Sequence, residues 1–131
     1  MTPGSTARFR FTVEHWAALW ANPHPQLAAR IVTPDVVVHW PGDAEPVRGV
    51  TAYRQRIAEI LERIPGLRPT VTEHASNGDF LFVRWTARGT GVNGSVRPSG
   101  VDRLRLRDGL VKEIRIYCDP ALLPALARPA T

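Results

Sequence analysis

The sequence predicts an α+β fold, with helices in its first half and an antiparallel sheet in its second. Apolar residues recur with a helical period from Val50 to Ile64. After Pro69 the period changes to two, which is typical of strands. Asn77-Gly78 and Asp108-Gly109 are dipeptides that favour tight hairpin turns. Helices that precede a run of hairpin-linked strands indicate the α+β class.

The length and composition favour one ordered domain. The chain has 131 residues, of which 44% are hydrophobic and 22% charged, so residues 1–131 are expected to form a single domain without a linker or a repeat. No apolar run is long enough to cross a bilayer, and the N-terminal residues lack the apolar stretch of a secretory signal. We therefore expect a cytoplasmic protein. Cys118 is the only cysteine; this excludes an intrachain disulfide, and we expect a small packed side chain there.

The positive charge of the chain comes almost entirely from arginine. The formal net charge is +5, and sixteen of the seventeen basic residues are arginine, which is typical of a GC-rich bacterial genome. Arg103, Arg105 and Arg107 are spaced by two and so describe one face of a strand rather than a basic run. Because basic charge alone supplies only non-specific binding, a nucleic-acid partner is not expected.

Two short helices are predicted before the first strand. From Thr12 to Trp20 apolar residues recur at three- and four-residue spacing, with Thr12 as the N-cap. Pro23 and Pro25 interrupt this helix, and Gln26 to Val32 then forms a second one. The long helix from Val50 to Ile64 ends at Pro65-Gly66.

The strands are predicted from β-branched or alternating segments bounded by turn residues. They are Asp35–Trp40, Val71–Ala75, Phe80–Arg88, Ser99–Arg107 and Leu110–Asp119. The tail that follows is rich in Ala, Pro and Leu and is compatible with a helical turn.

Familiar catalytic and cofactor motifs are absent or out of context. Residues 89–94 spell GxGxxG, but another strand follows where a dinucleotide site needs a helix, so we interpret them as a hairpin connection. The histidines show no metal-ligand spacing, and no GxSxG elbow occurs. We expect neither a metal nor another cofactor.

Asp102 is the residue whose position is hardest to explain by packing alone. Strand alternation places it on one face with Leu104 and Leu106, while the arginines lie on the other. A carboxylate on an apolar face must be paired, protonated, or exposed in a cavity. Alternatively, Asp102 lies at a frayed strand end in water or pairs with Arg84, which shares a face with Phe80.

The chain resembles a known family in its element order and in three stretches: Pro34-Asp35 to Trp40-Pro41, Arg48-Gly49 with the Tyr53 helix, and residues 100–109 with Asp119. It is similar to the SnoaL-like polyketide cyclases of the nuclear transport factor 2-like superfamily. The resemblance implies a cone, in which a curved antiparallel sheet wraps the long helix and leaves a pocket at its open end. The superfamily includes isomerases, cyclases, hydrolases and binding modules, so the fold does not specify the activity.

The same resemblance transfers only part of a catalytic set. Where ketosteroid isomerases carry the Asp that moves the proton, this chain has Trp40, and where they carry an oxyanion-binding Tyr it has Trp16. Their second acid, which is kept protonated by an apolar site, matches Asp102. At the two positions where we would place the Asp pair of the superfamily's epoxide hydrolases, the chain has Trp85 and Ile116, so epoxide hydrolysis is not expected.

These observations give two hypotheses. The first is a cofactor-free isomerase or cyclase in which Asp102 acts as a general acid or base on an enolisable, apolar or polyketide-like compound. The second is a non-catalytic ligand-binding or assembly module. In both, the ligand is a small apolar or polycyclic molecule, and the candidate ligand-binding residues are Trp16, Trp40, Tyr53, Arg84, Trp85 and Asp119. Trp20 is assigned to the core.

A homodimer is also expected, because the resemblance implies one and the outer face of the sheet offers charge pairs. The residues expected on that face are Arg103, Arg105, Arg107, Val111, Glu113, Arg115 and Tyr117.

Overall fold

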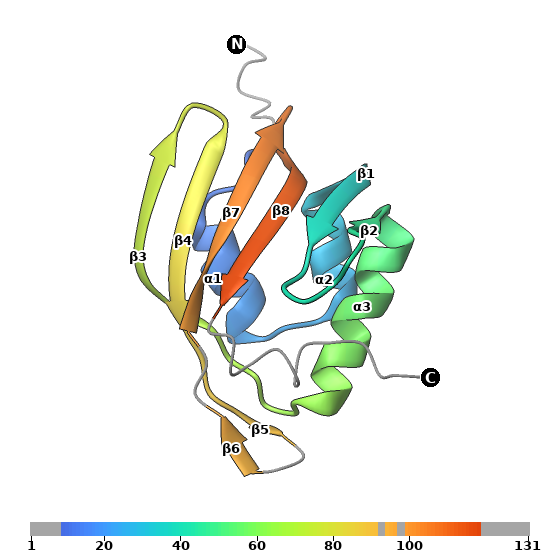
Figure 1. Cartoon of the computed structure of the whole chain (residues 1–131). Coiled ribbons are helices and arrows are strands. Elements are labelled where there is room, and N and C mark those ends of the chain that lie inside the picture. Colours follow the sequence, from blue (N-terminus) through green and yellow to red (C-terminus); the bar gives the residue numbers. More distant parts are fainter. Residues whose placement is uncertain (1–8, 92–93, 97–98, 119–131) are drawn as a thin grey trace.

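The computed structural model describes residues 9–91, 94–96 and 99–118. It has the α+β architecture that the sequence predicts: a curved, unclosed six-stranded sheet with three helices on its concave side (Figure 1). The helix α3 contacts α2 and the strand β1, so the long helix lies against the inner face of the sheet. The cone shape implied by the resemblance is confirmed.

The helices begin and end where proline, glycine and capping residues allow. They are α1 (Val13–Ala21), α2 (Pro25–Arg30) and α3 (Val50–Arg63). Thr12 is the N-cap of α1, as expected, and its backbone N–H donates to Nδ1 of His15 at 3.0 Å. The helix α2 begins one residue earlier and ends two residues sooner than predicted. Pro25 takes its first position, where a missing N–H costs nothing, and Val32 already belongs to the sheet.

The sheet has the strand order β2-β1-β8-β7-β4-β3. Its strands are β1 (Val32–His39), β2 (Val47–Arg48), β3 (Thr70–Asn77), β4 (Phe80–Thr86), β7 (Ser99–Arg107) and β8 (Leu110–Cys118). Both predicted turns form: Gly78 has φ +62°, and Asp108 and Gly109 have φ +53° and +85°. Two positive φ angles in succession suit the twist of a tight hairpin.

One strand pair departs from the expected antiparallel sheet. β1 runs parallel to β8, and its register is irregular between Val32 and Val37. Pro34 lies in that interval and has no N–H to donate to a ladder. The irregularity in β1 therefore falls at this proline. The strand begins three residues earlier than predicted. Its other edge pairs with β2, a strand that the sequence did not predict.

The glycine-rich connection is a hairpin, as expected. It forms a short antiparallel ribbon of β5 (Gly89–Gly91) and β6 (Gly94–Val96), which extends from the end of the main sheet (Figure 1). In β8, the register shifts opposite Arg105 and Leu106. This shift turns Val111 into the core, where it is fully buried, so it is not on the outer face as expected.

The core fills the space between the helices and the concave face. Its fully buried members come from several elements, among them Val36, Val38, Val83, Ile57, Ile60 and Leu104. Within the described part of the chain, no helix is long and apolar enough to cross a membrane.

Candidate functional site

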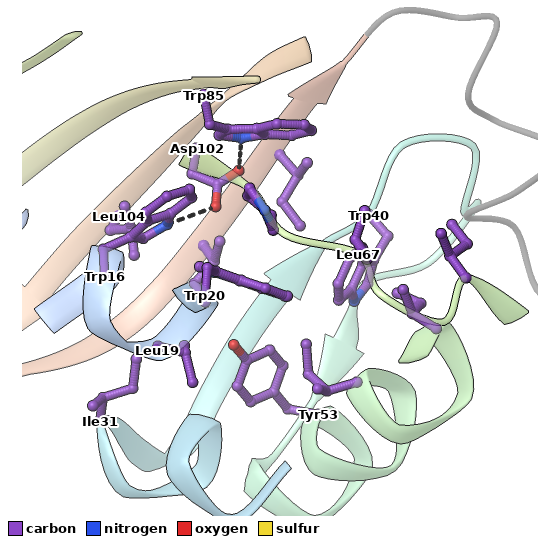
Figure 2. Close-up of a pocket in the computed structure, with 16 residues that line it drawn as sticks. Trp16, Leu19, Trp20, Ile31, Trp40, Tyr53, Leu67, Trp85, Asp102 and Leu104 are labelled. Carbon is purple, nitrogen blue, oxygen red and sulfur yellow. Dashed lines mark hydrogen bonds between the residues drawn. The ribbon is translucent and has the colours of Figure 1, made fainter. Parts of the chain in front are cut away.

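A cavity of about 70 Å³ opens between the concave face of the sheet and the helices. Aliphatic side chains from α3, β7 and β8 form much of its wall, and a group of aromatic side chains forms the rest (Figure 2). The lining residues are Trp16, Leu19, Trp20, Ile31, Trp40, Tyr53, Ile57, Ile60, Ile64, Leu67, Pro69, Trp85, Asp102, Leu104, Ile114 and Ile116.

Asp102 is the one carboxyl group among the described lining residues. Alternation along β7 turns it inward with Leu104, as predicted, and it is only 8% exposed. Two indoles donate to it: Nε1 of Trp85 to Oδ1 at 2.9 Å, and Nε1 of Trp16 to Oδ2 at 3.1 Å (Figure 2). Neither water at a frayed end nor Arg84 satisfies this acid. Two tryptophan N–H groups do.

Burial and these hydrogen bonds shift the pKa of Asp102 in opposite directions. Loss of solvent disfavours the charged form and is the larger influence, while the N–H donors of Trp85 and Trp16 favour it. Together they raise the pKa of Asp102 to about 6. The group is therefore mostly a carboxylate at neutral pH and takes up a proton in mildly acidic solution.

Gly100 lets Trp85 reach Asp102, a role that the sequence analysis missed. Gly100 lies opposite Trp85 in the β4–β7 ladder. A Cβ atom at this position would come within 2.7 Å of the Trp85 ring and would also meet the carbonyl oxygen of Tyr117. Only glycine leaves room for the indole to lie across β7 beside Asp102.

A buried ion pair between Arg56 and Asp43 packs against the ring of Trp40. The guanidinium of Arg56 lies 5.2 Å from the centre of the Trp40 ring, and it makes two hydrogen bonds to the Asp43 carboxylate, at 2.9 and 3.1 Å. Arg56 is 1% exposed, so this pair ties the turn after β1 firmly to α3. The Trp40 Nε1–H is itself buried without a hydrogen-bond partner.

Tyr53 contributes the other polar group of the cavity. It projects from the first turns of α3 and is 3% exposed. Burial, and to a lesser degree the charge of Asp102, raise the pKa of its phenol. The Tyr53 hydroxyl therefore stays protonated at neutral pH and can donate a hydrogen bond. Within the described residues it has no hydrogen-bond partner.

Five of the seven candidate site residues line the cavity: Trp16, Trp40, Tyr53, Trp85 and Asp102.

Arg84 does not join them. It lies on the opposite face of β4, its side chain is 61% exposed, and it pairs with Glu73 at 3.3 Å. Its placement as a cavity residue was wrong, because alternation turns it away from Trp85. Asp119 lies outside the described residues.

Trp20 is half-buried and packs against the core, as expected, and it also lines the cavity, which was not expected. Its spacing of four residues from Trp16 on the same helix was the available signal. No group of three or more His, Cys, Asp or Glu side chains that could hold a metal occurs in residues 9–91, 94–96 and 99–118.

The model of the SnoaL-like domain matches residues 13–114, which is most of the chain. The chain belongs to the SnoaL-like domain family. No curated protein matches it.

Solved structures agree on the fold at low identity. A protein with a ketosteroid isomerase-like fold from Catenulispora acidiphila DSM 44928, in complex with trimethylamine, is 18% identical with a TM-score of 0.76, covering 89% of this chain and 92% of that one. A protein from Jannaschia sp. CCS1 that is named as a SnoaL-like polyketide cyclase is 21% identical with a TM-score of 0.75, covering 90% and 92%.

An NTF2-like protein of unknown function from Burkholderia pseudomallei K96243 is 20% identical with a TM-score of 0.76, covering 88% and 95%. The SnoaL-like chain thus has the nuclear transport factor 2-like fold.

Proposed function

We propose that this SnoaL-like protein binds a small, largely apolar organic molecule in the cavity and that Asp102 moves a proton on it. The observation that carries the proposal is a buried carboxyl group on the cavity wall whose pKa is raised to about 6. A group that titrates near the working pH is suited to both accept and return a proton. The reaction class is a cofactor-free isomerisation or cyclisation of an enolisable compound.

The proton transfer begins with Asp102 as a base. Its carboxylate takes a proton from the carbon beside a carbonyl group, and the electron pair of the broken C–H bond moves onto the carbonyl oxygen as an enolate. The neutral Tyr53 hydroxyl is available to donate to that oxygen. Asp102 then returns the proton to another carbon. In a cyclisation, the enolate carbon instead attacks a second carbonyl carbon of the same molecule, the π electrons of that C=O bond move onto its oxygen, and this oxygen takes up the proton that Asp102 holds. This differs from the protonated donor that the resemblance implied for this position.

The indoles of Trp16 and Trp85 support the role of Asp102 as a base. Each gives one N–H to a carboxylate oxygen, and an ionised carboxylate has about four acceptor positions, so two remain for a proton or a ligand. These donors also hold the carboxyl group in one orientation on the wall. We expect general base catalysis from such a group to contribute about 10²- to 10⁴-fold.

A second candidate is a binding module that performs no chemistry. It is favoured by Trp40, which stands where the related isomerases carry their proton-moving Asp, and by the two hydrogen bonds that Asp102 already makes. The Catenulispora neighbour, which was solved with trimethylamine, is a protein of this fold that holds a small organic molecule. In this reading Asp102 anchors the ligand.

Deuterium exchange separates the two candidates. Small ketones such as butanone and cyclohexanone are incubated with the protein in D2O, and incorporation beside the carbonyl is followed by NMR. The enzyme hypothesis expects accelerated exchange that falls at least 10²-fold in Asp102→Asn. The matched control is Glu113→Gln on the outer face, where Glu113 pairs with Arg103. Binding of the ketones without any exchange would favour the module.

The proposal includes a single domain, a cytoplasmic location and a homodimer formed through the outer face of the sheet. That face exposes Tyr117 (51%) and Phe82 (37%) among the arginines, which gives a second copy both apolar area and charged groups to contact. Light scattering across micromolar concentrations tests the dimer. A monomeric mass throughout would contradict it.

A further inference from the structure

The cavity wall has an unbalanced charge. Of the sixteen side chains that line it in the described structure, only Asp102 and Tyr53 can ionise, and none is basic. Tyr53 stays neutral, so the carboxylate of Asp102 is the sole charge among the described lining residues. Its pKa responds to burial and to the two indole N–H groups, and no basic side chain of the described residues is among the causes. Within residues 9–91, 94–96 and 99–118, Asp102 therefore has hydrogen bonds but no counter-ion.

The remaining polar character of the wall comes from aromatic rings. Trp16 and Trp20 of α1, Trp40 after β1, Tyr53 of α3 and Trp85 of β4 surround the cavity (Figure 2). The faces of such rings attract cations and repel anions. Trp40 already shows this preference, because the Arg56 guanidinium lies 5.2 Å from its ring centre.

These features rank the classes of ligand. An anionic ligand would be repelled by Asp102 at a short distance in a medium of low dielectric constant. A neutral apolar ligand would expel water and leave the carboxylate without compensation. A cation would compensate the carboxylate and contact the aromatic rings at the same time.

We propose that the cavity selects a small organic cation, a protonated or alkylated amine, whose positive charge lies between the aromatic side chains and the Asp102 carboxylate. This inference rests on the proposed function, since it names the class of ligand for the same cavity. The cavity of about 70 Å³ admits a group of roughly five heavy atoms, because one water molecule needs about 10–15 Å³ of such space. A trimethylammonium group is of this size. A polycyclic ligand would require the walls to move.

A cationic ligand is compatible with proton transfer. A positive charge beside a carbon stabilises the negative charge that develops when that carbon loses a proton. An amine with a carbonyl group nearby would thus present a more acidic C–H bond to Asp102 than a neutral ketone does. The proton passes from this carbon to the carboxylate and back, so no oxidant or cofactor is needed.

The test uses choline and 3,3-dimethylbutan-1-ol, which have the same shape. Choline has a positively charged nitrogen where the alcohol has a neutral carbon. Binding is measured by calorimetry and by tryptophan fluorescence at constant ionic strength. At pH 7.5 we expect choline to bind at least tenfold more tightly than the alcohol. Between pH 7.5 and pH 5 its affinity should fall about tenfold as Asp102 becomes protonated, while that of the alcohol should not fall.

Two variants locate the effect. Asp102→Asn should abolish the preference for choline, whereas Glu113→Gln on the outer face should keep it. Should Asp102→Asn fail to fold, the pH dependence of the unchanged protein still decides the matter. Equal or tighter binding of the alcohol at pH 7.5 would overturn the cation proposal and leave the proposed function standing. If neither compound binds at concentrations up to about 100 mM, the proposed ligand site itself is wrong.

Discussion

The two faces of the sheet differ in how their charged side chains are compensated. On β7, Asp102 points into the concave side, while Arg103 and Arg107 point to the convex side. The outer arginines pair with carboxylates: Arg103 with Glu113 at 2.9 Å, and Arg107 with Asp35 at 2.7 Å. The inner acid accepts hydrogen bonds from two indole N–H groups, and no basic side chain of the described residues pairs with it.

The pKa values of the two aspartates express this difference. A hydrogen bond from Arg107 is the largest of the influences that lower the pKa of Asp35 to about 2, whereas burial raises that of Asp102 to about 6. A solvated, paired charge on the outer face costs little and contributes little. A buried charge without a counter-ion is costly to keep, so its presence in a cavity points to a function.

The largest expected effect comes from adding a second acid to the inner face. Val83 is fully buried and lies opposite Asp102 in the β4–β7 ladder. Val83→Asp should lower the free energy of unfolding by more than about 3 kcal/mol, because the new carboxyl group is buried beside an existing one. Thr86 on the same strand is exposed and faces outward, so Thr86→Asp should cost less than about 1 kcal/mol. Urea titrations measure both, and similar losses would contradict the distinction between the faces.

The next effect is a dependence of stability on pH that has opposite signs on the two faces. Asp102 has a pKa of about 6 in the folded state, above the ordinary value of 3.8 for an aspartate. The unfolded chain therefore releases this proton first as the pH rises, and between pH 4 and pH 6 Asp102 should lower the free energy of unfolding by up to about 3 kcal/mol.

Asp35 should act in the other window, since its pKa is lowered to about 2. Its contribution is present above pH 4 and is lost as the pH falls toward 2. Comparing wild type with Asp102→Asn and with Asp35→Asn by thermal and urea unfolding at a series of pH values tests both. Parallel curves for wild type and Asp102→Asn between pH 4 and pH 6.5 would show that Asp102 is solvated.

A smaller effect should follow from removing one indole donor at a time. Trp16→Phe and Trp85→Phe each delete an N–H that favours the carboxylate, so each should raise the pKa of Asp102 above about 6 and lower stability at pH 7 by about 1–3 kcal/mol. Trp40→Phe is the matched control, because its N–H has no partner in the described structure. Carboxyl ¹³C titrations give the three pKa values. The same shift in all three variants would mean that ring volume, and not hydrogen bonding, sets the titration.

The smallest effect is expected at an exposed pair on the outer face. Arg84 and Glu73 are 61% and 69% exposed. Glu73→Gln should change the free energy of unfolding by less than about 0.5 kcal/mol, and added salt should reduce that difference further. A larger change would show that the outer face contributes more to stability than its exposure suggests.

The sequence by itself determined the class of fold, the long helix and both hairpin turns, because periodicity and turn residues act over a few neighbours along the chain. It also placed Asp102 on the apolar face of its strand, since alternation in a strand is a local rule.

Only the tertiary structure decided what surrounds Asp102. Trp16 precedes it by 86 positions and Trp85 by 17, and no local pattern indicates that their N–H groups converge on one carboxyl group. The room that Gly100 leaves for Trp85, the parallel pairing of β1 with β8 and the shift that buries Val111 are likewise set by contacts between distant segments. Hydrogen bonds and packing across the sheet depend on register and curvature, and these are properties of the assembled fold rather than of any short stretch of the chain.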